Sequence, residues 1–387
     1  MCGCSDAYED LGLRSVFLRS LQLQHFRNYG ALKLDFPDRL TFLVGENGSG
    51  KTNILEAISV LTSGKSFRGV PDQELVQEKQ SGFYLSCTYE WQSSHTLEMG
   101  VQVEGRLQRR IKKDGKVLPS RAALIGNLVS IVFSPDDLEI IQGGPTARRR
   151  FLDALLSHRD SAYLDCLIQY NRAVRQRNTI LKEIRNNRSR LNMLDPWDRS
   201  LVELGTRITG QRKKFLSEYE PILNESLNQI SGGKDSIRVS LFPGESDSEL
   251  YRKAMQERRM RDVATGSTTF GPHRDRLLFL TQDGSDKDVQ FRFSQGQKRS
   301  LVLALRVGQF YYLKQYIGRS PILLIDDVIR ELDYKRRDYF VDLLHKCGQA
   351  FFTTPDLDGL ESAVQATSAR IINVPDLHSA VTDSKSQ

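Results

Sequence analysis

The sequence lacks the features of a secreted or membrane-spanning protein. Its five cysteines are an odd number without a C-x-x-C pair, so they predict neither a disulfide framework nor a zinc knuckle. No run of about 20 residues is free of charge, which excludes a membrane-spanning helix, and residues 1–15 have no apolar segment typical of a secretion signal. The six histidines are too scattered for metal-ligand spacing. We therefore expect a cytoplasmic, globular protein with no membrane partner.

Neither sign of charge dominates the whole chain, but the charge is unevenly distributed. The 387 residues include 55 Lys and Arg against 48 Asp and Glu, a net charge of +7. Between Arg148 and Glu220 there are 16 basic and 9 acidic side chains, so the positive excess of this segment equals the net charge of the whole chain. A local basic surface suits a polyanion such as DNA. A solvated helix face with internal ion pairs explains the charge equally well.

The most specific motif lies between a predicted strand at residues 40–44 and an amphipathic helix that begins at Lys51. It reads G-x-x-x-x-G-K-[ST] and consists of Gly45, Glu46, Asn47, Gly48, Ser49, Gly50, Lys51 and Thr52. The glycines let backbone N–H groups approach phosphate oxygens, Lys51 supplies a positive charge, and Thr52 supplies a hydroxyl for Mg²⁺. This P-loop, or Walker A motif, predicts that the protein binds ATP.

Two acids follow an apolar strand at residues 322–325. In a P-loop protein the first, Asp326, supports Mg²⁺, and the second, Asp327, orients or deprotonates the attacking water. Asp327 and Lys51 are therefore the predicted catalytic residues, and Thr52 and Asp326 the predicted metal ligands. This Walker B motif lies far from the P-loop in the sequence, which predicts a large insertion between two parts of one ATPase head.

A third motif precedes a predicted helix at residues 296–316. Ser294, Gln295, Gly296 and Gln297 resemble the L-S-G-G-Q signature of ABC-type ATPases. In that architecture the signature of one subunit covers the ATP of the other, which predicts an ATP-dependent homodimer. A serine-capped helix without a ligand is the alternative.

The pattern of elements predicts an α/β fold: a P-loop ABC-type ATPase head of mixed sheet and helices, with an inserted α-helical lobe or arm. We expect helices over residues 146–193 and 196–230, with Asp195 as an N-cap and a kink at Pro221. The predicted parts are an N-terminal tail at 1–15, a first head segment at 16–135, the lobe at 136–264, a second head segment at 265–374 and a C-terminal tail at 375–387.

Further blocks resemble the RecF family of bacterial repair ATPases. They are F-R-N-Y at 26–29, K-S-F-R at 65–68, F-S-P-D-D-L at 133–138, R-R-R-F-L-D at 148–153, Q-R-N at 176–178, G-P-H-R-D at 271–275 and E-L-D at 331–333. The resemblance runs from about residue 17 to residue 360. It implies an SMC-like head that places Asp333 at the dimer seam.

The same resemblance implies an ATP-dependent DNA-binding protein of DNA replication and recombinational gap repair. Such a protein binds junctions of double- and single-stranded DNA, dimerises with ATP and acts as a weak DNA-dependent ATPase. It assists RecO and RecR in loading RecA and supports the SOS response. The ATP-hydrolysing subunit of another ABC system, such as a transporter, is the alternative.

Three further sets of polar residues each allow a functional and a structural interpretation. The triplet at 148–150 is expected to contact DNA, with pairing to acids in the arm as the alternative. A predicted hairpin carries Arg106, Arg109, Arg110, Lys112, Lys113 and Lys116, which either meet phosphates or protect a sheet edge. His273 and Arg274, beside a Gly-Pro turn, are expected to be structural hydrogen-bonding residues.

Overall fold

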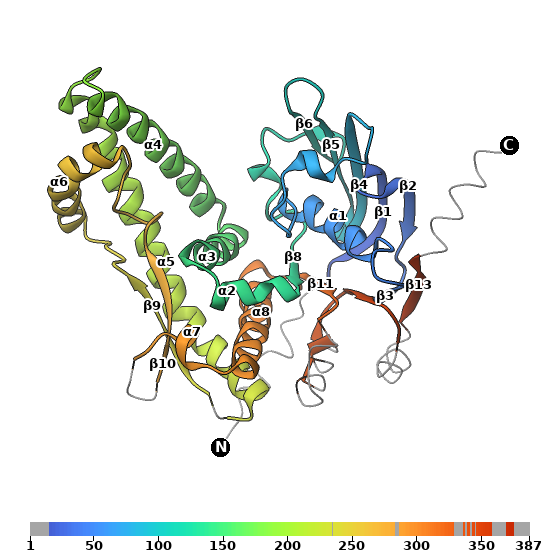
Figure 1. Cartoon of the computed structure of the whole chain (residues 1–387). Helices are drawn as coiled ribbons and strands as arrows, with labels where there is room; N and C mark the ends of the chain where they lie inside the picture. The colour runs from blue at the N-terminus through green and yellow to red at the C-terminus, as the bar shows by residue number, and fades with distance from the viewer. Residues whose placement is uncertain are drawn as a thin grey trace. The chain divides into compact units, whose positions relative to one another are not determined.

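The computed structural model divides into two compact units. It describes residues 15–233, 235–282, 286–328, 336, 339–340, 343–344, 346–357 and 369–374. The first unit comprises the chain up to Asp137 and again from Leu305, and the second unit is Leu138–Ala304. The chain therefore leaves the first unit once and returns to it, as an inserted lobe requires (Figure 1).

The first unit contains two sheets. Its strands are β1 (Phe17–Phe26), β2 (Tyr29–Asp35), β3 (Leu40–Val44), β4 (Gly82–Trp91), β5 (Ser93–Gln102), β6 (Gln108–Lys113), β7 (Lys116–Val117), β8 (Ser130–Phe133), β11 (Ile322–Asp326), β12 (Ala350–Thr354) and β13 (Arg370–Asn373). Helix α1 (Lys51–Ser63) also belongs to this unit, and α8 (Gln295–Ile317) crosses the boundary between the two units.

A parallel sheet of five strands carries the order β13-β3-β12-β11-β8. Every residue of β11 and β12 is buried, as expected for apolar strands that are covered on both faces. Because the strands are parallel, the ends of β3, β11 and β12 meet at one edge of the sheet. This edge holds the P-loop and the two acids.

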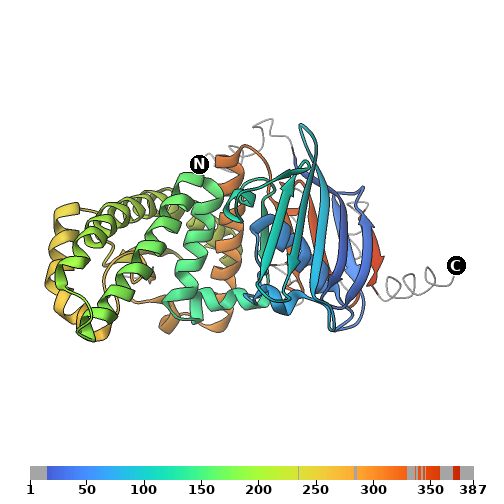
Figure 2. The same cartoon turned by 90° about the horizontal axis from the view of Figure 1, so that it is seen from above.

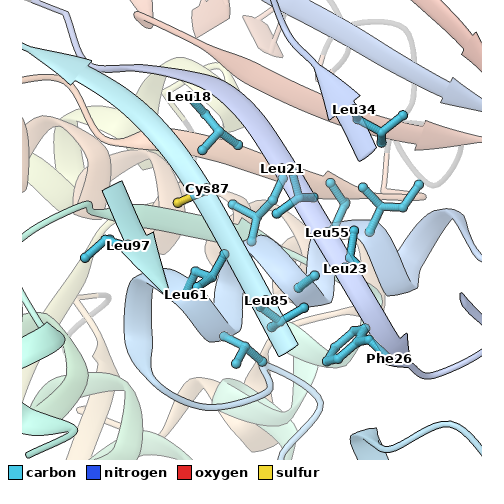
Figure 3. Packing of buried hydrophobic residues seen from close by; sticks show 14 of the residues in the cluster. Leu18, Leu21, Leu23, Phe26, Leu34, Leu55, Leu61, Leu85, Cys87 and Leu97 are labelled. Atoms are coloured by element: carbon cyan, nitrogen blue, oxygen red, sulfur yellow. The ribbon is translucent and has the colours of Figure 1, made fainter. Parts of the chain in front are cut away.

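An antiparallel sheet of six strands has the order β2-β1-β4-β5-β6-β7, and its strands lie side by side in Figure 2. In β1, Leu21 and Leu23 are buried while Gln22 between them is more exposed, since successive side chains point to opposite faces. Helix α1 contacts strands of both sheets. Figure 3 shows Leu55 and Leu61 of this helix among leucines of β1 and β4, which form one apolar core.

The second unit is mainly helical. Its elements are α2 (Glu139–Gln142), α3 (Pro145–Arg159), α4 (Ser161–Arg185), α5 (Asp195–Ser231), β9 (Ile237–Phe242), α6 (Ser248–Thr265), β10 (Arg276–Thr281) and α7 (Val289–Arg292). The two longest helices, α4 and α5, pack along each other, and α6 packs on both (Figure 1). Their contact side chains recur at helical spacing, for example Leu201, Ile208 and Phe215 of α5.

The expected helical hairpin is confirmed, with differences at its ends. Asp160 interrupts the first helical stretch and caps α4 by accepting a hydrogen bond from the Ala162 amide at 2.8 Å. The prediction that Asp195 is an N-cap is wrong. A short 3₁₀ turn runs directly into α5, so Asp195 already has helical backbone angles and its carboxylate pairs with Arg259. Helix α5 continues without interruption through Pro221.

The division between the units also differs in part from the expected segments. The two compact units meet in the sequence after Asp137 and after Ala304, whereas the sequence analysis placed the lobe at 136–264. The reason is that β10 pairs with β9, which groups the residues after α6 with the lobe. The two predicted tails lie largely outside the described residues. Among the described helices, none has the length and hydropathy needed to cross a bilayer.

Candidate functional site

The P-loop connects the end of β3 to the start of α1, as the sequence predicted. Gly50 is the N-cap of α1 and has a left-handed backbone, with φ of 104°. A Cβ atom at Gly50 would lie 2.6 Å from both the side-chain nitrogen Nδ2 of Asn28 and the Tyr29 hydroxyl. Glycine is therefore required here both for its backbone angles and for the close approach of the loop at residues 28–29. Glu46, Asn47 and Gly48 are exposed at the tip of the P-loop.

The Lys51 ammonium lies across the inside of the P-loop. Its Nζ donates hydrogen bonds to the carbonyl oxygens of Gly45 at 2.6 Å and Glu46 at 2.8 Å. Burial lowers the pKa of Lys51, and the nearby carboxylates of Asp327 and Asp326 oppose this shift. The side chain thus brings a positive charge to the N-terminal end of α1, where backbone N–H groups and the helix dipole already favour an anion.

Asp326 joins the P-loop to the far end of the sequence. Its Oδ1 accepts hydrogen bonds from the Thr52 hydroxyl at 2.7 Å and from the Thr353 hydroxyl at 2.8 Å. Burial raises the pKa of Asp326, although both hydrogen bonds oppose this shift. The predicted metal ligands Thr52 and Asp326 are therefore adjacent, since β11 and α1 meet at the same edge of the parallel sheet.

Asp327 follows directly and has an unusual backbone. Its φ is 51°, in the left-handed region, and its amide donates to the Thr353 hydroxyl at 3.0 Å. Its Oδ1 is buried without a hydrogen-bond partner among the described residues. A buried oxygen of this kind is costly unless a ligand satisfies it. A left-handed backbone and an unsatisfied buried oxygen therefore occur together at this residue, a combination that is typical of functional sites.

The donor set fits Mg²⁺. Thr52 and Asp326 provide hard oxygen ligands, and Mg²⁺ commonly uses one or two carboxylates together with substrate phosphates and water. The part of the chain that the structure describes has no group of three or more His, Cys, Asp or Glu side chains that could hold a metal. An ion at Thr52 and Asp326 would therefore need phosphate oxygens to complete its coordination.

Sequence reasoning missed the residues that support the P-loop. Glu56 of α1 is fully buried and accepts two hydrogen bonds from Arg27, each of 2.8 Å, as well as one from the Ser66 hydroxyl. Asn53 donates to Asn28 at 2.8 Å. The family-like blocks at 26–29 and 65–68 gave a signal for these residues, but their pairing through Glu56 became visible only in the fold. Thr353 had no signal at all.

The signature residues Ser294, Gln295, Gly296 and Gln297 belong to the second unit. Ser294 Oγ accepts a hydrogen bond from the backbone amide of Gln297 at 3.3 Å, and the side-chain Oε1 of Gln297 accepts one from the backbone amide of Ser294 at 2.9 Å. This reciprocal pair is a capping box at the start of α8. The serine-capped helix is thus present, and the side chains of Ser294 and Gln295 are exposed. Asp333, the predicted seam residue, lies outside the described residues.

The expectation that all three arginines at 148–150 contact DNA is wrong for Arg148. This side chain is 3% exposed and forms a two-pronged ion pair with Asp288, at 2.8 and 3.0 Å. Arg149 is partly buried and donates to the Asp275 carbonyl at 3.0 Å. Only Arg150 is exposed. Arg148 thus pairs with an acid, but Asp288 lies outside the predicted arm, so the alternative of pairing with acids in the arm is not the one realised.

Two other polar sets include residues that make internal contacts. In the hairpin, Arg109 pairs with Asp72, and Lys112 lies 3.6 Å from Glu98. His273 accepts a hydrogen bond from the Tyr170 hydroxyl at 2.7 Å and donates to the Thr268 carbonyl at 3.0 Å. Burial lowers the pKa of His273 to about 4. The expected structural role of His273 is confirmed.

The basic surface of the lobe is nevertheless real. A set of arginines and lysines on α4, α5 and their connection is exposed and has no ion pair or side-chain hydrogen bond within the described residues: Arg172, Arg175, Lys182, Arg185, Arg188, Arg190, Arg199, Arg207 and Lys214. We call these nine residues the arm cations. Internal pairing therefore does not account for the positive charge of the lobe.

Known proteins resemble this chain over almost its whole length. The family described as RecF/RecN/SMC N terminal domain matches residues 17–374. A DNA replication and repair protein RecF from Leptospira interrogans is 40% identical over 351 residues, which cover 90% of this chain and 94% of the relative. Another from Synechococcus is 34% identical over 359 residues, covering 90% of this chain and 93% of the relative.

Solved structures agree with these relatives. The recombination mediator protein RecF with ATP, from the RecFOR pathway, is 32% identical with a TM-score of 0.83 and covers 89% of this chain and 93% of its own. An Smc head domain from Pyrococcus furiosus, bound to the C-terminal domain of ScpA, is 16% identical with a TM-score of 0.50 and covers 91% of this chain and 92% of its own. The second likeness concerns the fold alone.

Proposed function

The chain belongs to the RecF family of DNA replication and repair proteins, and on that premise we propose that ATP controls how it binds DNA. The observation that carries the proposal is the contact between Thr52 of the P-loop and Asp326 of β11, at 2.7 Å. This contact brings the two halves of a nucleotide site together from opposite ends of the chain. The family membership does not favour the transporter subunit considered as an alternative.

ATP is the nucleotide we assign to the site. The amides of residues 45–52 and the N-terminus of α1 would surround the β and γ phosphates. Lys51 would exchange its bonds to the Gly45 and Glu46 carbonyls for phosphate oxygens, a change that requires only rotation of a flexible side chain. Thr52 and Asp326 would hold Mg²⁺, which would neutralise phosphate charge when bound. Thr353 would keep the Asp326 carboxylate oriented.

Hydrolysis is assigned to Asp327. Its unpartnered, buried Oδ1 is an acceptor that could orient water. The aspartate side chain is one methylene shorter than the glutamate usual in ABC-type heads, so we propose slow turnover. A slow, weak and DNA-dependent ATPase suits a switch, since the bound ATP then persists long enough to maintain one state of the protein.

Dimerisation is the proposed consequence of ATP binding. The exposed Ser294 and Gln295, at the start of α8, would face the γ phosphate held by a second copy, with Asp333 at the seam between the copies. The helix N-terminus gives this surface a favourable dipole for an anion. Each nucleotide would then be enclosed by the P-loop of one subunit and the signature of the other.

DNA binding is assigned to the arm cations. Side chains that are exposed and unpaired can neutralise phosphates and release counterions, which gives strong salt dependence with little base preference. Gapped DNA with junctions of double and single strands is the proposed ligand. RecO and RecR are the proposed partners, and loading of RecA, with support of the SOS response, is the proposed outcome.

The test measures binding to a labelled gapped duplex by fluorescence anisotropy, with ATP or ADP and Mg²⁺. We expect tighter binding with ATP than with ADP, and loss of that difference in Lys51→Ala. An Arg207→Ala and Lys214→Ala double variant should bind more weakly with both nucleotides and show a shallower salt dependence. Equal affinity with ATP and ADP would contradict the proposed control. An unchanged salt dependence in the double variant would contradict the assignment to the arm cations.

A further inference from the structure

The signature loop is fixed by side chains from elsewhere in the second unit. Gln297 uses both ends of its amide group: Oε1 accepts from the Ser294 amide at 2.9 Å, and Nε2 donates to Asp235 Oδ1 at 2.8 Å. Because one end of the amide is an acceptor and the other a donor, the two contacts together fix its orientation. The carboxylate of Asp235 thereby determines which way Gln297 faces.

Gln297 in turn determines the conformation of Ser294. The reciprocal bonds of the capping box hold the residue that begins the signature against the first turn of α8. If the amide of Gln297 rotated, its nitrogen would face the Ser294 N–H, and a donor would meet a donor. Removing the acceptor at Asp235 therefore affects Ser294, two contacts away.

The residues that follow Asp235 are fixed by hydrogen bonds to other elements. Asp235 lies between the end of α5 and the start of β9. The next residues are held on both sides: Asn224 of α5 exchanges two hydrogen bonds with the backbone of Ile237, at 2.8 and 2.9 Å. The Gln282 amide donates to the Ser236 carbonyl at 3.3 Å. A side chain on such a support can act as a fixed reference for the signature loop.

A second, weaker contact holds the other signature glutamine. Gln142, the last residue of α2, donates to Gln295 Oε1 at 2.8 Å and accepts at its own carbonyl from Gln290 of α7 at 2.9 Å. Both side chains in the first of these contacts are exposed. Water can replace it readily, so it constrains the loop less than the partly buried contact between Asp235 and Gln297.

We propose that Asp235 is a positioning residue for the signature: it orients Gln297, and through it Ser294, toward the nucleotide of a second copy. This inference rests on the proposed function, because it assumes that the signature acts in the other subunit of an ATP-dependent dimer. Asp235 is not one of the residues that would hold nucleotide or Mg²⁺ in the proposed site. Its loss should therefore weaken dimerisation while leaving nucleotide binding by the monomer unchanged.

The experiment compares full-length variants at Asp235 by sedimentation velocity in increasing concentrations of a non-hydrolysable ATP analogue with Mg²⁺. Asp235→Leu keeps the side-chain size but removes the acceptor, whereas Asp235→Asn keeps an oxygen that can accept from Gln297. Glu249→Ala removes an exposed carboxylate of α6 from the same unit and is the matched control. Ser294→Arg tests the composite site itself.

We expect Asp235→Leu to need about tenfold more analogue for half-maximal dimerisation, the factor that a hydrogen bond to a carboxylate typically contributes. Asp235→Asn and Glu249→Ala should behave like the wild type. All four variants should remain folded at the assay temperature, and their analogue affinity under monomeric conditions should be unchanged. Normal dimerisation of Asp235→Leu, or an equal defect in Asp235→Asn, would overturn the inference while Ser294→Arg still fails to dimerise. Normal dimerisation of Ser294→Arg would instead overturn the proposed function.

Discussion

Replacing Arg148 by alanine should destabilise the second unit strongly. The guanidinium is 3% exposed and donates to both oxygens of Asp288, and also to the carbonyls of Ile140, Ile141 and Leu277 at 3.0–3.1 Å. Removing one partner of a buried ion pair costs about 3–5 kcal/mol, because the other charge is left without compensation. Among the described residues, the Asp288 carboxylate would then keep its bond to the backbone amide of Gln290. We expect the lower value, about 3 kcal/mol, which lowers the melting temperature by roughly 10 °C.

The two tryptophans of the chain allow the second unit to be followed by itself. Trp91 lies in β4 of the first unit and Trp197 in α5 of the second. In a Trp91→Phe background, fluorescence therefore reports the unfolding of the unit that contains Arg148. Arg150→Ala, which removes the exposed neighbour, should change the free energy of unfolding by less than about 0.5 kcal/mol.

The salt dependence of DNA binding should also distinguish the two arginines, but here the effect is expected at Arg150 and not at Arg148. Below its melting temperature, Arg148→Ala should keep the wild-type slope of log affinity against log salt. If Arg150 meets a phosphate, Arg150→Ala should make that slope shallower by about 0.9. A stable Arg148→Ala protein with a shallower salt slope would refute the reasoning, because it would mean that this side chain contacts DNA rather than Asp288.

Three further predictions concern the nucleotide site and the lobe. Asp326→Asn should weaken binding of a fluorescent ATP analogue more than about tenfold in Mg²⁺ but little in EDTA, since its oxygen serves the ion; equal losses in both buffers would contradict this. Arg27→Met should lower the free energy of unfolding of the first unit by about 2–4 kcal/mol in urea titrations, because Glu56 remains buried, and a change below 1 kcal/mol would be inconsistent with that pair. His273 has a pKa lowered to about 4 in the folded protein, whereas the unfolded side chain titrates near the ordinary histidine value of about 6.5, so the unfolded state takes up the proton first as pH falls. Between pH 7.5 and 5 the wild type should therefore lose about 2 kcal/mol more stability than His273→Gln, and parallel pH profiles would argue against a neutral, half-buried histidine.

Local sequence patterns were sufficient to predict the nucleotide site in outline. The eight residues of the P-loop, the strand before it and the helix after it are consecutive, so their chemistry depends on neighbours in the chain. The apolar strand before Asp326 also predicts that this acid lies at an edge of a parallel sheet. Long-range pairing was not predictable in the same way. Thr353 supports Asp326 only because β12 lies beside β11.

The arginine triplet shows the same limit in the lobe. Arg148 and Arg150 are indistinguishable as letters in one helix, yet one is buried against Asp288, which lies 140 residues away in the sequence, and the other is exposed. Helical periodicity places them on different faces, but it does not show which face is covered. The boundary between the units was displaced for a related reason, since pairing of β10 with β9 cannot be read from either strand alone.

The proposed function depends most on a nucleotide site shared by two copies of the chain. Mixing two defective variants tests this directly, with ATP hydrolysis in the presence of gapped DNA as the readout. Lys51→Ala lacks a working P-loop and Ser294→Arg lacks a working signature, so each alone should be inactive. In a mixed dimer, the intact P-loop of the Ser294→Arg subunit meets the intact signature of the Lys51→Ala subunit. A shared site predicts that mixing restores hydrolysis; a mixture that stays inactive while it forms dimers would contradict it.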